Sequence, residues 1–204
     1  MATLAPLVVV VSMLTGCGGD ADPGAHSSTT QPPTAPPTDV SWTTFSGVQV
    51  PCADQGPKDC YGSAPTGYEH TGAGAALAAI SATIRMSIAD DVVWPKVVGA
   101  LVSPSPARDQ WSINRVRISI VHPVEKDQAP VVEGYTIDSY TPQKATVGII
   151  TRQPDKSLTR TTATVVWSVT GDWLLELPAT DNTTPRVQAI TTAPADMIDL
   201  PEPS

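Results

Sequence analysis

The fold is decided by residues 132–178, VEGYTIDSYTPQKATVGIITRQPDKSLTRTTATVVWSVTGDWLLELP, in which apolar and polar side chains alternate. A period of two, with many β-branched and aromatic residues, is typical of strands that bury one face. The predicted strands are Val132–Tyr140, Ala145–Arg152, Leu158–Val169 and Trp173–Pro178. Residues with turn chemistry separate them, such as Gly171-Asp172 before the last strand. Sequential strands with short connections predict a four-stranded antiparallel meander.

The residues before this stretch have helical periodicity instead. Thr71 fits a helix N-cap, and an apolar stripe follows it at helical spacing. The stripe consists of Leu77, Ile80, Ile84 and Ile88. A second helix is predicted from Asp90-Asp91, because Pro95 then falls in its first turn, where a missing N–H costs least.

The segment Arg108–Val121 fits two structures. Ile113, Val116 and Ile120 have helical spacing, whereas Val116, Ile118 and Ile120 have strand spacing, and we prefer the helix. Residues Trp42–Val50 predict either a further strand or an extended arm. Helices followed by strands indicate an α+β fold, with N-terminal helices packed on the four-stranded meander and disordered tails at both ends.

Composition divides the chain into five segments. Residues 18–38 are rich in Gly, Ser, Thr and Pro and hold no large apolar side chain, so they cannot offset the entropy of ordering. The predicted segments are a signal peptide at 1–16, a disordered tether at 17–39, an extended arm with a disulfide loop at 40–64, the α+β domain at 65–178 and a disordered acidic tail at 179–204.

The first residues predict export. Leu4–Leu14 is almost wholly apolar, which suits a signal-peptide core and is too short to span a bilayer. The following Leu14-Thr15-Gly16-Cys17 resembles the lipobox of bacterial lipoproteins, in which the cysteine is acylated. This resemblance implies a lipid anchor on Cys17 and a place at the outer face of the cytoplasmic membrane. An ordinary signal peptide with a buried cysteine is the alternative.

The two other cysteines, Cys52 and Cys60, lie in a segment rich in Pro, Gly and Asp. Export permits a disulfide, which would close a loop that has little core of its own. Zinc and free thiols are the alternatives, but a metal site needs more ligands than this segment offers. The sequence therefore favours a Cys52–Cys60 disulfide and predicts no metal and no cofactor.

The charge distribution argues against nucleic-acid binding. The formal net charge is −8, and all 12 Lys and Arg residues fall between Lys58 and Arg186, where acids nearly balance them. Phosphate binding needs clustered bases. Arg108, Arg115 and Arg117 are the nearest to a cluster, and a solvated helix face is the preferred interpretation.

Candidate catalytic residues are few. His70 and His122 are the only histidines outside the tether, and neither has a partner carboxylate in sequence. No nucleophile elbow or phosphate loop is present. Large aromatic side chains could instead line a ligand cavity between helices and sheet, with a filled core as the alternative. These candidates are Trp94, Tyr135, Trp167 and Trp173.

Several short motifs together resemble a known family. They are Trp42, Gly47, Gly56-Pro57, Gly67-Tyr68-Glu69-His70-Thr71, Gly74-Ala75, Ala78-Ala79, Gly134-Tyr135 and Gly171-Asp172-Trp173. Their order resembles a domain of unknown function in actinobacterial exported proteins, often encoded near conjugative elements, over about residues 42–178. The arrangement also resembles the cone-shaped nuclear-transport-factor-like (cystatin-like) fold of conjugation and secretion scaffolds. The resemblance implies no active-site residues, because a fold alone does not define an activity.

These observations predict a lipid-anchored, extracytoplasmic and non-enzymatic protein that docks another envelope protein, as in a conjugation or secretion apparatus. Homo-oligomerisation stays open. The alternative function is binding of a small apolar ligand in a cavity between helices and sheet.

Overall fold

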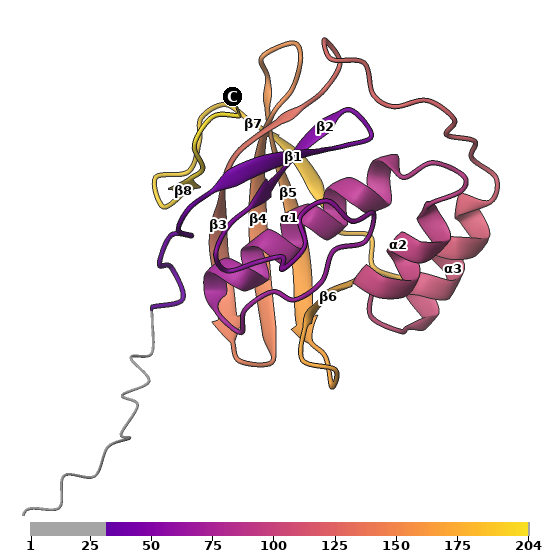
Figure 1. Ribbon diagram of the computed structural model, residues 1–204, viewed down its shortest axis with the longest axis horizontal. Helices are drawn as coiled ribbons and strands as arrows, with labels where there is room; N and C mark the ends of the chain where they lie inside the picture. Colours follow the sequence, from indigo (N-terminus) through magenta and orange to yellow (C-terminus); the bar gives the residue numbers. More distant parts are fainter. Residues whose placement is uncertain (1–31, 204) are drawn as a thin grey trace, which may run out of the picture. The chain divides into compact units, whose positions relative to one another are not determined.

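The computed structural model describes residues 32–203, and these residues form mostly β-sheet with three helices (Figure 1). The strands make a six-stranded antiparallel sheet and a separate two-stranded sheet. The predicted signal peptide, Cys17 and most of the predicted tether lie outside the described residues. Within residues 32–203, no helix is long and apolar enough to cross a membrane.

Four consecutive strands form the centre of the large sheet. They are β3 (Val131–Thr141), β4 (Lys144–Arg152), β5 (Leu158–Trp167) and β6 (Trp173–Glu176). Each pairs antiparallel with the next, as the alternating pattern predicts. Gly148 lies in the middle of β4, where a Cβ atom would come within 2.5 Å of the Arg160 guanidinium on β5. Arg160 thereby crosses β4 and forms an ion pair with Asp138 on β3.

The predicted architecture of helices on a four-stranded meander is wrong. The segment 179–204, predicted as a disordered tail, contributes β7 (Val187–Ile190) and β8 (Ile198–Asp199) to the sheet. β7 pairs with the first half of β5, and β8 pairs with Gly134 and Tyr135 of β3. The sheet therefore has six strands, and the cone-shaped fold implied by the resemblance is not observed.

A hairpin precedes the helices. β1 (Ser41–Phe45) and β2 (Val48–Cys52) form the two-stranded sheet. Their turn has positive φ at Ser46 (46°) and Gly47 (88°), the geometry that suits a two-residue hairpin loop. A Cβ atom on Gly47 would lie 2.0 Å from the Val124 carbonyl oxygen, so glycine is required there. The Trp42 indole N–H donates to the Pro201 carbonyl at 3.0 Å and joins the hairpin to the last described residues.

The first helix follows the sequence prediction. α1 spans Gly72–Ile88, and the Thr71 hydroxyl accepts a hydrogen bond from the Gly74 N–H at 3.1 Å, which confirms the N-cap. α1 lies across the large sheet (Figure 1). Its alanines are buried, and Leu77 and Ile80 are fully buried against residues such as Val165 of β5. Small side chains let the helix approach the sheet closely, and the core lies between them.

The other two helices begin or end away from their predicted limits. α2 spans Trp94–Leu101, because the Asp90 carboxylate accepts from the N–H groups of Val92 and Val93 and holds a turn before it. α3 spans Pro106–Arg115, with the Ser105 hydroxyl as its N-cap. The preferred helix over Arg108–Val121 is thus right only as far as Arg115. Residues 116–121 follow as an irregular segment.

Candidate functional site

Two of the sequence motifs, Gly67–Thr71 and Gly171–Trp173, are fastened to each other by hydrogen bonds. Asp172, in the turn between β5 and β6, is only 8% exposed. Its carboxylate accepts hydrogen bonds from the backbone N–H groups of Gly67 (2.6 Å), Tyr68 (3.1 Å) and Trp173 (2.9 Å). The Trp173 indole N–H donates to the Glu69 carbonyl at 3.0 Å. The Gly-Asp-Trp and Gly-Tyr-Glu-His-Thr motifs therefore hold the loop before α1 against the end of the sheet.

His70 belongs to the same aromatic contact. Its ring stacks on Trp167 with centroids 3.9 Å apart and meets Trp173 edge-on at 5.5 Å. Nε2 hydrogen-bonds to the Pro142 carbonyl oxygen, which can only accept, so Nε2 carries a proton. His122 lies in an exposed loop. Within residues 32–203, neither histidine forms an ion pair with a carboxylate.

The four candidate cavity residues lie in three different environments. Trp167 and Trp173 pack on each other and on His70. Tyr135 is fully buried in β3, and burial raises the pKa of its hydroxyl. Trp94, at the start of α2, contacts Trp111 of α3 with centroids 6.0 Å apart. The structure therefore does not bring the four rings together around one space.

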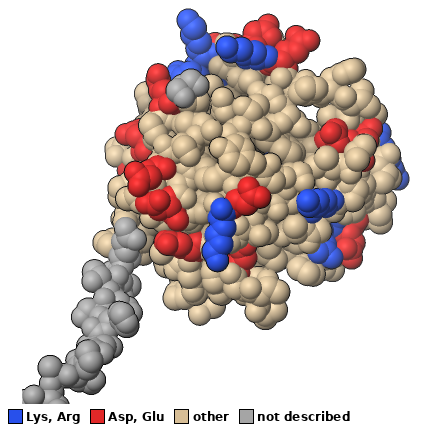
Figure 2. All heavy atoms as spheres, viewed as in Figure 1, with Lys and Arg blue, Asp and Glu red and all other residues tan. Residues whose placement is uncertain are grey.

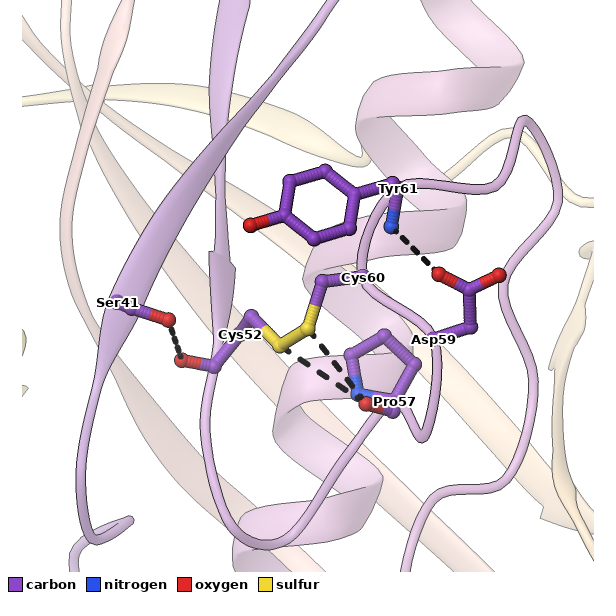
Figure 3. The surroundings of a disulfide bond; sticks show 6 residues. All are labelled: Ser41, Cys52, Pro57, Asp59, Cys60 and Tyr61. Atoms are coloured by element: carbon purple, nitrogen blue, oxygen red, sulfur yellow. Dashed lines mark hydrogen bonds between the residues drawn. A yellow bond between two sulfur atoms is a disulfide. The ribbon is translucent and has the colours of Figure 1, made fainter.

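The two cysteines form a disulfide between β2 and the following loop (Figure 3). Their Cα atoms are 6.0 Å apart, and both sulfur atoms lie against the Pro57 carbonyl oxygen. The bridge closes the loop that runs from the hairpin to the motif loop. The sequence prediction of a Cys52–Cys60 disulfide is confirmed.

Replacing both Cys52 and Cys60 with serine should lower the free energy of unfolding by about 2–3 kcal/mol, the chain-entropy value for a short closed loop. Urea unfolding monitored by tryptophan fluorescence measures the change. Cys17→Ser is the matched control and should leave the midpoint unchanged. Equal midpoints for the double variant and the native chain would contradict a stabilising role.

Arg115 links three segments near the end of α3. Its side chain is 4% exposed. The guanidinium donates to the Asp91 carboxylate (3.1 Å), the Ala89 carbonyl (2.8 Å) and the Ile118 carbonyl (2.6 Å). Asp91 also accepts from the Ile120 N–H at 3.0 Å, and this hydrogen bond is the main reason that the pKa of Asp91 is lowered. The 116–121 segment is thereby held against the start of α2.

This junction leaves apolar side chains at the surface. Val92 is 87% exposed and Val116 is 69% exposed, and Ile118 and Val121 are also exposed. We call these four side chains the Val/Ile surface. Arg117 is exposed in the same segment, whereas Arg115 of the predicted basic cluster is buried. Figure 2 shows Lys and Arg scattered among acidic side chains on the face in view, without a continuous basic patch there.

A pocket lies between α1, α3 and the edge of the large sheet where β6 and β7 pair with β5. We call it the helix–sheet pocket, and its volume is about 540 Å³. Its lining consists of Thr83, Met86, Ser87, Trp111, Asn114, Arg115, Ile118, Ile120, Thr161, Leu175, Leu177, Arg186 and Val187. Sequence reasoning missed it, because Arg186 and Val187 fall in the segment predicted to be disordered and Thr83 carries no motif.

The part of the chain that matches a known protein family extends beyond these motifs. A family model described as "Domain of unknown function (DUF8175)" matches residues 15–194, which include the fastened motifs and β7. None of the curated proteins and none of the solved structures compared matches the chain.

Proposed function

The chain belongs to the DUF8175 family, whose description assigns no activity, and on that premise we propose that it is a docking protein of the cell envelope. Acylated Cys17 holds it at the outer face of the cytoplasmic membrane, and the folded domain binds another envelope protein without catalysing a reaction. The motif resemblance to exported proteins encoded near conjugative elements supports a place in a conjugation or secretion apparatus.

The Val/Ile surface is the observation that carries this proposal. Single exposed apolar side chains are ordinary, but neighbouring ones that are held in place indicate a contact surface. Hydrogen bonds that the Asp91 carboxylate accepts from Ser119 and Ile120 fix the 116–121 segment. The exposed side chains of this segment are therefore presented without a large loss of chain entropy on binding.

The chemistry of this surface defines the partner. Apolar side chains with an exposed Arg117 alongside suit a protein surface that has an apolar centre and a carboxylate at its margin. The β-branched residues of 116–121 are strand formers in an irregular segment, which further suits pairing with an extended segment of the partner.

Site-specific photo-crosslinking in cells of the native host tests the proposal. A photoreactive residue at Val116 should capture one recurrent envelope protein, and the second substitution Val121→Asp should reduce that yield at least about fivefold, since a buried charge is costly. Val169 is the matched control, because it is also a valine, is even more exposed in the β5–β6 turn, and should capture nothing recurrent.

Fractionation of the same cells tests the anchor. Cys17→Ala should move the captured complex, or the free protein, from the membrane to the soluble fraction. Recurrent capture at Val169 but not at Val116 would overturn the docking surface, and membrane retention of the Cys17→Ala protein would overturn the anchor.

A further inference from the structure

The helix–sheet pocket combines an apolar wall with two unusual polar groups. Met86, Trp111, Ile120, Leu175 and Leu177 make most of the wall. The Thr83 hydroxyl is buried and has no hydrogen-bond partner within residues 32–203. A buried hydroxyl without a partner destabilises a fold by itself, so its position in a pocket wall points to a ligand that completes the hydrogen bond.

Arg186 is the second group. Its Nε donates to the Thr162 carbonyl at 3.3 Å, and no carboxylate of residues 32–203 pairs with its guanidinium. Arg186 is half-buried, and this burial lowers the pKa of its guanidinium. The other cation of the pocket, Arg115, is already bound to Asp91 and two carbonyls. Arg186 therefore supplies the available positive charge.

No acidic side chain lines this pocket among its described residues. A partly desolvated guanidinium and an unpartnered hydroxyl in the lining of one pocket favour an anion, and the apolar wall favours a hydrocarbon body. A volume of about 540 Å³ lies within the range of small-molecule sites and suits one short chain or ring system.

We propose that the helix–sheet pocket binds a small amphipathic anion, with its carboxylate or phosphate held by Arg186 and Thr83 and its hydrocarbon against Trp111, Leu175 and Leu177. This site adjoins the Val/Ile surface at Ile118, which lines the pocket, whereas Val92, Val116 and Val121 do not line it. It also differs from the aromatic cavity predicted from the sequence, because none of those four rings lines it.

Isothermal titration calorimetry of the purified protein with three decyl probes tests the charge preference. Decanoate below its micelle concentration should bind, decanol should bind more weakly, and decyltrimethylammonium should not bind measurably. Arg186→Gln should reduce decanoate affinity about 10-fold or more and leave decanol affinity unchanged, since only the anion uses the guanidinium. Arg186→Lys should restore part of the decanoate affinity. Arg152→Gln is the control for a lost arginine, because Arg152 pairs with Glu133 and does not line this pocket.

Thr83→Val separates a binding role from a structural one. Valine has nearly the shape of threonine and removes the unpartnered hydroxyl, so the free protein should keep or raise its melting temperature. The same variant should reduce decanoate affinity about fivefold. A lower melting temperature with unchanged decanoate affinity would show that the hydroxyl serves the fold and would overturn its part in the site.

Two further results would overturn the proposal as a whole. Equal affinity for decanoate and decyltrimethylammonium would remove the anion preference. Binding to phosphatidylglycerol vesicles without binding to monomeric decanoate would assign this region to a membrane surface. Neither result bears on crosslinking at Val116, so the two proposals fail independently.

Discussion

Replacing Asp172 with alanine should lower the free energy of unfolding by about 3–5 kcal/mol and should release the loop before α1 from the sheet. Three backbone N–H groups lose their acceptor at once, and a buried unpaired donor costs about 1–3 kcal/mol. The loop then no longer places the Glu69 carbonyl for the Trp173 indole. Urea unfolding and hydrogen exchange of the Gly67 and Tyr68 amides measure the two effects.

Two variants control this experiment. Asp172→Asn keeps the volume and one acceptor oxygen, so it should cost less than the alanine variant. Asp155→Ala removes a turn aspartate that accepts from Ser157 at an exposed position, and it should cost well under about 1 kcal/mol. Equal losses for Asp172→Ala and Asp155→Ala would show that the fastened motifs do not stabilise the fold.

Replacing Arg115 with alanine should lower the free energy of unfolding by about 2–4 kcal/mol, the second largest effect. The change leaves the Ala89 carbonyl without its donor and opens the space under Trp94, where the guanidinium carbon lies 5.7 Å from the ring centroid. Limited proteolysis should then cut within residues 116–121 before any other site. Arg115→Met fills the same space without the hydrogen bonds and should show an intermediate loss.

This junction also gives a pH dependence with a defined sign. The pKa of Asp91 is lowered in the folded protein, first by the Ile120 N–H and then by the Ser119 hydroxyl. Its contribution to stability is therefore complete above its ordinary pKa near 3.8 and is lost as the pH falls through the lowered value. Protection of the Ile120 amide against exchange, relative to its intrinsic rate, should fall only below about pH 3.8, and in Arg115→Ala it should be low already at neutral pH.

Local signals were sufficient for most of the individual elements. The Thr71 hydroxyl and the apolar stripe after it identify α1, because capping and helical spacing depend on residues close in sequence. The alternation in residues 132–178 identifies β3, β4, β5 and β6 for the same reason.

The sequence did not predict the pairing of strands that lie far apart along the chain. β7 has only four residues and lies between stretches rich in Thr and Pro. It becomes a strand because it pairs with Leu158–Thr161 of β5. β8 has two residues and depends in the same way on β3. Without these partners the segment has the composition of a disordered tail, so the fold prediction failed there.

The same distinction between local signals and long-range pairing decides which candidate sites could be predicted from the sequence. The disulfide was predictable because the two cysteines lie near each other in a segment that has little core of its own and too few other metal ligands. The helix–sheet pocket was not, because Thr83, Trp111 and Arg186 meet only after β7 has joined the sheet. The strand spacing of Val116, Ile118 and Ile120 was a sequence signal for the Val/Ile surface. It predicted a strand, but within residues 32–203 this segment pairs with no other strand.

The hydrogen bond between Trp42 and Pro201 joins segments that lie 159 residues apart in sequence. Closing so long a loop costs chain entropy that local contacts do not offset, so contacts of this separation form after the elements between them have folded. We therefore expect the β1–β2 hairpin to join the C-terminal segment late in folding.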